Sequence, residues 1–176
     1  MKRNITLLGI LFLVFLMVGC KSGNLKEQHT TYNVIENGKK TYFENYEFTK
    51  DIPSFDSILK STIKSLNEIK DGKRDLTFVR SIESEELKSD PDYKVFSKSI
   101  PGDSELKIKK ADITNYNITG VEHNKDENLI KVFIEIETKE VQDDSVINVL
   151  NNQTYIFKVE KDMLLLTKFH LSQHLQ

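Results

Sequence analysis

The chain has 176 residues, with 25 Lys or Arg and 27 Asp or Glu, so its formal net charge is −2. This slightly acidic balance argues against a nucleic-acid partner and against purely electrostatic attachment to anionic lipid. Cys20 is the only cysteine, which excludes an internal disulfide, so the folded part must be stabilised by its core.

The first twenty residues have the pattern of an export signal. Lys2 and Arg3 precede an apolar run over residues 5–18, which is too short for a membrane-spanning helix and fits the apolar part of a cleaved signal peptide. The run ends in Leu16, Met17, Val18, Gly19 and Cys20. This ending resembles the lipobox of bacterial lipoproteins, with Met17 where Leu is usual. The alternative is a plain signal peptide that leaves Cys20 as a free thiol.

The lipobox resemblance implies a lipid anchor. Lipoprotein cysteines receive a diacylglyceryl group on sulfur and become the first mature residue, so we expect removal of residues 1–19 and attachment of Cys20 to the extracytoplasmic face of the cell membrane. Stable anchoring needs at least two acyl chains, which this modification supplies. Residues 20–29 are mostly polar and predict a lipidated tether. Residues 30–176 suffice for a single domain.

The domain begins with a predicted hairpin. Tyr32 and Val34 alternate with polar neighbours, and a β-rich run resumes over residues 41–43. Between them, Asn37 and Gly38 form the preferred pair for a type I′ turn.

A helix is predicted after Pro53. Its apolar positions recur every three or four residues, and Gly72 offers a stop. These positions are Phe55, Ile58, Leu59, Thr62, Ile63, Leu66 and Ile69. Residues 75–102 allow a strand or short helices, and Pro91 and Pro101 break whatever forms there.

From Glu105 onward the apolar period changes to two, which predicts four or five strands. Apolar residues alternate with polar ones over residues 130–136, where Lys131 and Glu135 face away from the apolar side. Short polar connections make this sheet antiparallel.

We therefore predict an α+β fold: a long amphipathic helix packed on a curved four- to five-stranded antiparallel sheet, with an N-terminal hairpin. Over residues 53–171 the order of these elements resembles the NTF2-like and cystatin-like folds of small lipoproteins. NTF2-like domains often carry a Trp on the last strand, and Phe169 would take its place here, because the chain has no Trp.

The sequence predicts no catalytic residue, cofactor or metal site. It has no Gly-x-Ser-x-Gly elbow or glycine-rich phosphate loop. His170 and His174 are four residues apart, but they fall in a strand-like run without a third ligand. The acidic pairs at residues 126–127 and 143–144 lack the spacing of a calcium loop.

The candidate partner contacts are Phe133 and Glu135. Phe133 is one aromatic residue among outward-facing charges, a pattern typical of protein contacts. The alternative is that Phe133 packs beneath the helical segment or the hairpin.

We therefore predict a membrane-anchored lipoprotein that acts as a binding or assembly module of the bacterial cell envelope, with a protein partner and no enzymatic activity. One alternative is an NTF2-like pocket domain that binds or isomerises a small apolar ligand, with Asp112 as its base if that side chain points inward. Another is an accessory lipoprotein of a conjugation or secretion system.

The anchor gives the first testable prediction. Cys20→Ser should move the protein from the membrane to the soluble fraction in cell fractionation, because it removes the sulfur that carries the lipid. The circular dichroism spectrum should not change. A Cys20→Ser protein that remains in the membrane would contradict the lipobox interpretation.

Overall fold

The computed structural model describes residues 30–44, 52–98, 108–143, 145–161 and 163–175. The predicted lipobox, Cys20, the rest of the tether up to residue 29 and the predicted break at Pro101 lie outside these ranges.

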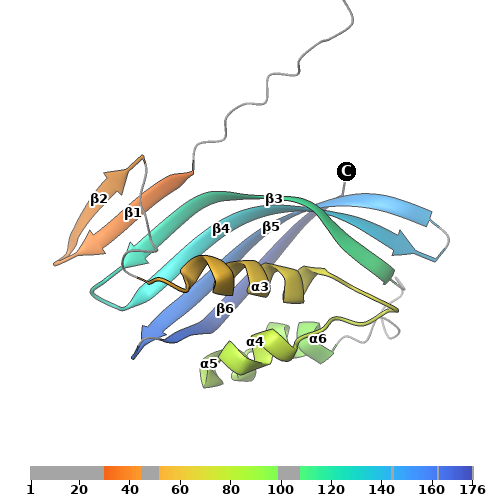
Figure 1. Ribbon diagram of the computed structural model, residues 1–176, viewed down its shortest axis with the longest axis horizontal. Coiled ribbons are helices and arrows are strands. Elements are labelled where there is room, and N and C mark those ends of the chain that lie inside the picture. Colours follow the sequence, from red (N-terminus) through yellow and green to blue (C-terminus); the bar gives the residue numbers. More distant parts are fainter. Residues whose placement is uncertain (1–29, 45–51, 99–107, 144, 162, 176) are drawn as a thin grey trace, which may run out of the picture.

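The described strands form one six-stranded sheet in the order β2-β1-β3-β4-β5-β6. Their bounds are β1 Thr31–Glu36, β2 Lys39–Phe43, β3 Ile108–Asn124, β4 Leu129–Gln142, β5 Ser145–Glu160 and β6 Met163–Leu175. Strand β1 runs parallel to β3, and every other neighbouring pair is antiparallel. Figure 1 shows the long strands as a curved sheet, with the short β1–β2 hairpin at one end.

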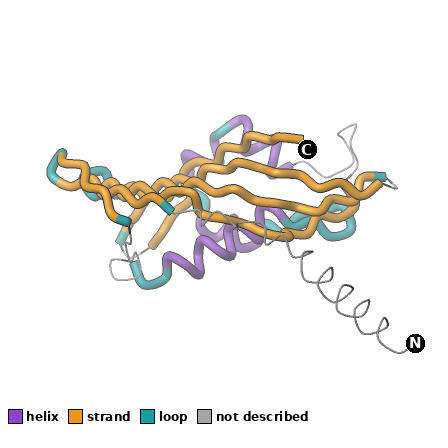
Figure 2. Tube along the Cα trace, turned by 90° about the horizontal axis from the view of Figure 1, so that it is seen from above, coloured by secondary structure: helices purple, strands orange, loops and turns teal. Residues whose placement is uncertain are grey.

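Four helices lie on one side of this sheet, beneath its curve (Figures 1 and 2). They are α3 Phe55–Asn67, α4 Thr77–Ile82, α5 Glu85–Ser89 and α6 Pro91–Lys98. Helix α3 lies across the strands, and α4 and α5 contact the edge strand β6. We call the sheet face toward the helices the inner face and the opposite one the outer face.

The predicted fold class is wrong. The structure is mostly β, with 59% strand and 24% helix, and its sheet is six-stranded and mixed rather than four- to five-stranded and antiparallel. The helices are short, and the cystatin-like arrangement is not supported. The error arises because alternation identifies strands but not their partners: the N-terminal hairpin joins the main sheet through a parallel contact between β1 and β3, about 90 residues apart in the chain.

The helix predicted after Pro53 does form, but it ends earlier than its apolar pattern indicated. Glu68 already has extended backbone angles, and Ile69 forms an isolated β-bridge with Ala111 of β3. The backbone N–H and C=O of Ile69 exchange hydrogen bonds of 3.0 Å with Ala111. Sheet pairing therefore stops the helix before Gly72.

Helix α3 forms the core with the inner face. Phe55, Leu59, Ile63 and Leu66 are all buried, with at most 3% exposure. The ring of Phe55 meets Phe157 of β5 edge-on, with centroids 6.4 Å apart. Burying four large apolar side chains stabilises this packing by roughly 1.5–3 kcal/mol for each side chain.

Strand β4 has the alternation that the sequence predicts. Ile130, Val132, Ile134 and Ile136 are buried on the inner face, while the residues between them are exposed or half-buried. Its neighbours pair with it in antiparallel register along nearly its whole length.

One carboxylate connects the turn of the hairpin to the turn between β3 and β4. Asn37 and Gly38 have positive φ angles of 53° and 70°, as a type I′ turn requires. Their backbone N–H groups donate hydrogen bonds of 2.7 and 2.8 Å to the carboxylate oxygens of Asp126, in the turn between β3 and β4. Lys40 also forms an ion pair of 2.7 Å with Glu122. These contacts connect two turns that lie far apart in the sequence.

Asp126→Ala should loosen the hairpin without unfolding the domain. It removes both acceptors, so amide exchange at Asn37 and Gly38 should accelerate, while the free energy of unfolding should fall by no more than about 1.5 kcal/mol because the contact is exposed. Hydrogen exchange measured by NMR would check this, with Glu127→Ala as the matched control. Unchanged exchange in Asp126→Ala would contradict the role assigned to this carboxylate.

Candidate functional site

The outer face holds the candidate site. No helix among the described residues covers it, and the strand register aligns side chains from five strands there. One row consists of Thr31, Gly120, Phe133, Thr154 and His170. Neighbouring strands are about 4.8 Å apart, so the part of this row from β3 to β6 spans roughly 14 Å.

Phe133 lies on this outer face and is 38% exposed. It therefore does not pack beneath the described helices, which was one of the two alternatives that its sequence position left open; the other was packing beneath the hairpin. A Cβ atom on Gly120 would come within 3.3 Å of the Phe133 ring, so the absence of a side chain at Gly120 makes room for that ring. The Lys131 ammonium lies 5.2 Å from the ring centroid, within reach of a cation–π interaction.

A shallow groove of about 330 Å³ lies beside Phe133. Its described lining residues are Thr119, Phe133, Ile134, Asn152, Gln153, Thr154, His170, Leu171 and Ser172. None of these is Lys, Arg, Asp or Glu. The lining therefore combines one aromatic ring with hydroxyl, amide and imidazole groups.

Glu135 lies one row away from Phe133, between Asn117 of β3 and Asn152 of β5. It is half-buried and borders the groove rather than lining it. The structure thus places both predicted contact residues on the same open face.

The sequence did not predict a second polar cluster, which is buried on the inner face. Asn67 of α3 donates a hydrogen bond of 3.2 Å to the hydroxyl of Tyr155, and it accepts one of 2.6 Å from the Gln153 side chain. The Tyr155 hydroxyl donates to Gln153. Burial raises the pKa of Tyr155 above its ordinary value, so the hydroxyl remains a donor. These contacts fix the end of α3 on β5.

Arg74 and Glu140 extend this cluster. The Arg74 Nε donates a hydrogen bond of 3.0 Å to the Leu66 carbonyl, and the guanidinium lies 4.4 Å from the centroid of Phe96. Burial lowers the pKa of Arg74, and Glu140 acts in the opposite direction. Asn151 is buried, and its Oδ1 has no hydrogen-bond donor among the described residues. We interpret this cluster as packing of the helical layer.

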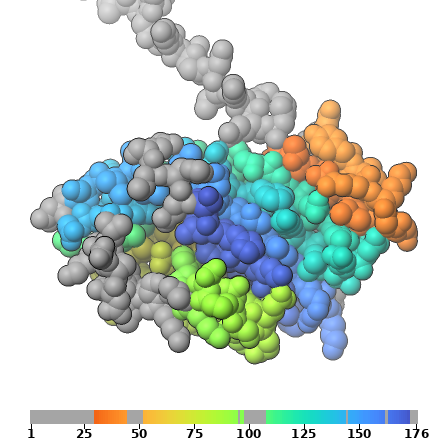
Figure 3. All heavy atoms as spheres, turned by 180° about the vertical axis from the view of Figure 1, so that it is seen from behind, coloured from red at the N-terminus to blue at the C-terminus, as the bar shows by residue number. Residues whose placement is uncertain are grey.

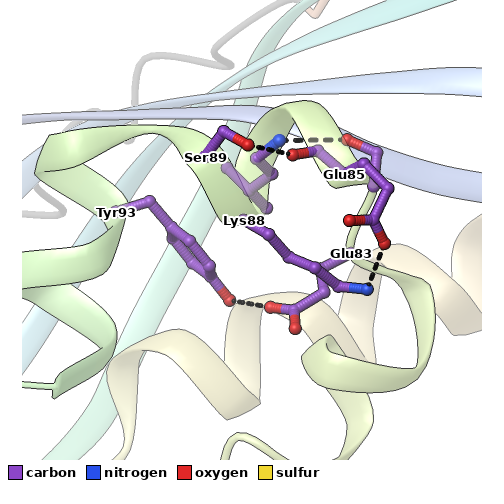
Figure 4. Close-up of polar contacts among 7 residues, drawn as sticks. Glu83, Glu85, Lys88, Ser89 and Tyr93 are labelled. Atoms are coloured by element: carbon purple, nitrogen blue, oxygen red, sulfur yellow. Dashed lines mark hydrogen bonds and ion pairs between the residues drawn. The ribbon is translucent and has the colours of Figure 1, made fainter.

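The helical layer itself is attached to the edge strand β6, and Figure 3 shows the green helical segment next to the dark-blue β6. Figure 4 shows the hydroxyl of Tyr93 in α6 donating to Glu83, at 2.9 Å, beside the ion pair of Lys88 and Glu85. Burial, followed by the bond to Glu83, raises the pKa of Tyr93. The Ser84 backbone N–H donates a hydrogen bond of 3.0 Å to the carbonyl of Leu166 in β6. These contacts are structural.

A second hollow, of about 390 Å³, lies along the flank of α3. Lys64, Lys70 and Lys73 line it together with the acids Glu68 and Asp75. Because both signs of charge alternate there and the lysines are surface side chains, this hollow has no distinct ligand preference.

The other residues considered from the sequence do not come together. The Asp112 carboxylate is 2.6 Å from the Lys110 ammonium and 47% exposed, so it does not face an enclosed apolar pocket. His170 and His174 both belong to β6, where four residues span about 13 Å. Within the described ranges, no three His, Cys, Asp or Glu side chains are grouped to hold a metal ion.

No protein-family model matches the chain, and neither a curated protein nor a solved structure is detectably similar to it. In the part of the chain that the structure describes, none of the helices has the length and apolar character needed to cross a membrane.

Tyr155→Phe should test the buried cluster. It removes the two hydrogen bonds of the hydroxyl, while Asn67 and Gln153 remain bonded to each other. The free energy of unfolding should therefore fall by about 0.5–1.5 kcal/mol. Urea denaturation would measure this loss. Tyr116→Phe, which removes an exposed hydroxyl, is the control, and equal stabilities of the two variants would show that the network contributes nothing.

Proposed function

We propose that this protein is a lipid-anchored lipoprotein on the extracytoplasmic face of the cell membrane, whose domain binds a partner through the outer face of its sheet. The observation that carries the proposal is the uncovered outer face, with an exposed aromatic residue and a groove beside it. All described helices pack on the other face, so the binding surface does not compete with the core.

The anchor limits where this surface can act. Nine residues lie between Cys20 and Thr30, the first described residue, so the chain takes ten steps from one to the other. An extended chain spans at most about 3.5 Å per step. The domain would then stay within roughly 35 Å of the membrane. A short tether of this kind suits a module that holds or recognises components of the envelope close to the membrane.

The groove chemistry favours binding over catalysis. Proton-transfer catalysis commonly pairs titratable groups whose environments shift their pKa values in opposite directions. Among the described lining residues only His170 has an ionisable side chain, and it is exposed. Asp112, the base considered for an isomerase, is ion-paired at the surface. A surface that only binds a partner requires neither a catalytic acid nor a catalytic base.

Site-specific photocrosslinking in intact cells would test this proposal. A photoreactive phenylalanine replaces Thr154 in the groove, and a matched control places it at Lys60, on the exposed side of α3. We expect adducts from position 154 and few from position 60. Equal yields at the two positions would contradict the assignment of the outer face.

Substitutions at the predicted contacts provide a second readout. Phe133→Leu and Glu135→Lys should each reduce the adduct yield from position 154, because they change the ring and the charge at the groove. Asp112→Asn should leave the yield unchanged. A yield that falls with Asp112→Asn but not with Phe133→Leu or Glu135→Lys would contradict the assignment of these contacts.

A further inference from the structure

We infer that the groove beside Phe133 binds a neutral glycan strand. This inference deepens the proposed function, because it names the chemical class of partner for the same surface. It follows from three properties of the groove: unused hydrogen-bonding groups, an exposed aromatic ring and an uncharged lining.

The first property is hydrogen-bonding capacity directed toward solvent. Asn152, His170 and Ser172 are exposed, and Thr154 is half-buried. These four side chains come from neighbouring positions on β5 and β6, and none of them makes a hydrogen bond to a side chain or backbone group of the described residues. Together they offer donors and acceptors, which is the mixture that a ligand rich in hydroxyl groups requires.

The second property is the ring of Phe133. It stands in the same row as Thr154 and His170, so an apolar surface lies next to the polar groups. A sugar ring has the complementary construction, with hydroxyl groups at its rim and C–H groups on its faces. A ligand could therefore cover the aromatic ring and bond to the polar side chains at once.

The third property is the charge of the groove. A phosphate or another anion would call for Lys or Arg, and a basic peptide would call for Asp or Glu. The described lining contains none of these residues. The nearest described charges stand in the two neighbouring rows: Glu135 in one, and Glu122, Lys131 and Lys168 in the other. Neither sign of charge predominates among them. Charge complementarity therefore favours an uncharged polar partner.

A protein partner fits these observations less well. Protein interfaces are centred on clustered aromatic and Arg side chains in desolvated pockets. Here the described lining has a single aromatic ring and no Arg, and most of its other side chains are polar, with Ile134 and Leu171 as the apolar exceptions. The groove is also shallow and spans several strands, which suits an extended polymer better than a compact ligand.

Co-sedimentation of the full-length protein, held in detergent micelles, with insoluble chitin and with cellulose tests this inference. Both are neutral polysaccharides, and chitin adds an acetamido group. Soluble dextran sulfate serves as the anionic competitor. We expect retention on at least one polymer, with no displacement by dextran sulfate.

The variants are chosen to separate binding from folding. Phe133→Leu retains an apolar cover over Gly120 but lacks the aromatic face, and Asn152→Ala removes an exposed amide that has no partner in the described structure. Each should weaken retention about tenfold, the effect of losing one good contact. Tyr116→Ala is the matched control. Tyr116 is 40% exposed, but it pairs with Ile136, whose side chain faces inward. Tyr116 therefore lies outside the outer face and the groove.

The outcomes are distinct. A folded protein that is retained on neither polymer would overturn the glycan assignment. Retention of both Phe133→Leu and Asn152→Ala at the level of the unaltered protein would also overturn it. Displacement by dextran sulfate would show that charge governs binding and would overturn it as well. If glycans fail while photocrosslinking from position 154 gives a protein adduct, the outer face still binds a partner and only the class named here is wrong.

Discussion

The register of β4 is the constraint on which the rest of the molecule depends. Four of its side chains, Ile130 to Ile136 at every second position, are buried beneath the helices, and pairing on both sides holds the strand in place. A slip of one residue would exchange the two faces and would place Lys131, Phe133 and Glu135 in the core. The burial that stabilises the domain therefore also determines which side chains the outer face presents.

Strand β3 pairs with β4 less regularly than β5 does. The register shifts between Ile113 and Asn115 and again between Ile118 and Gly120. Such irregularities increase the local twist of a sheet. The second shift lies next to the position where Gly120 meets Phe133, so the irregular stretch of β3 borders the ring on the outer face.

The sequence was informative wherever the physical signal was local. The alternation in β4, the apolar face of α3 and the turn at Asn37 and Gly38 are each specified by neighbouring residues. The exposure of Phe133 followed from the same alternation. These features gave the candidate surface before its surroundings were known.

The sequence was uninformative where distant segments meet. Nothing local shows that β1 pairs in parallel with β3, and this pairing made the predicted fold class wrong. Asn67, Asn151 and Gln153 are polar but buried, because α3 covers this part of the inner face. The hydrogen bonds between Asn67 and Gln153 form only when α3 and β5 meet. Segment 75–98 forms three short helices whose docking on β6 depends on contacts such as that of Ser84 with Leu166. The groove likewise requires the pairing of β4, β5 and β6.

The parallel entry of β1 has a mechanical consequence for an anchored domain. The chain enters the sheet at Thr31, which is paired with Gly120, and Gly120 is in turn paired with Phe133. If lipid holds one end and a bound polymer holds the groove, tension between them crosses only two strand spacings, about 10 Å. The force would act on the hydrogen bonds of β1, β3 and β4 and would bypass α3 and its apolar contacts. Under load, the weakest point would be the short β1 strand, while the helical layer would stay folded.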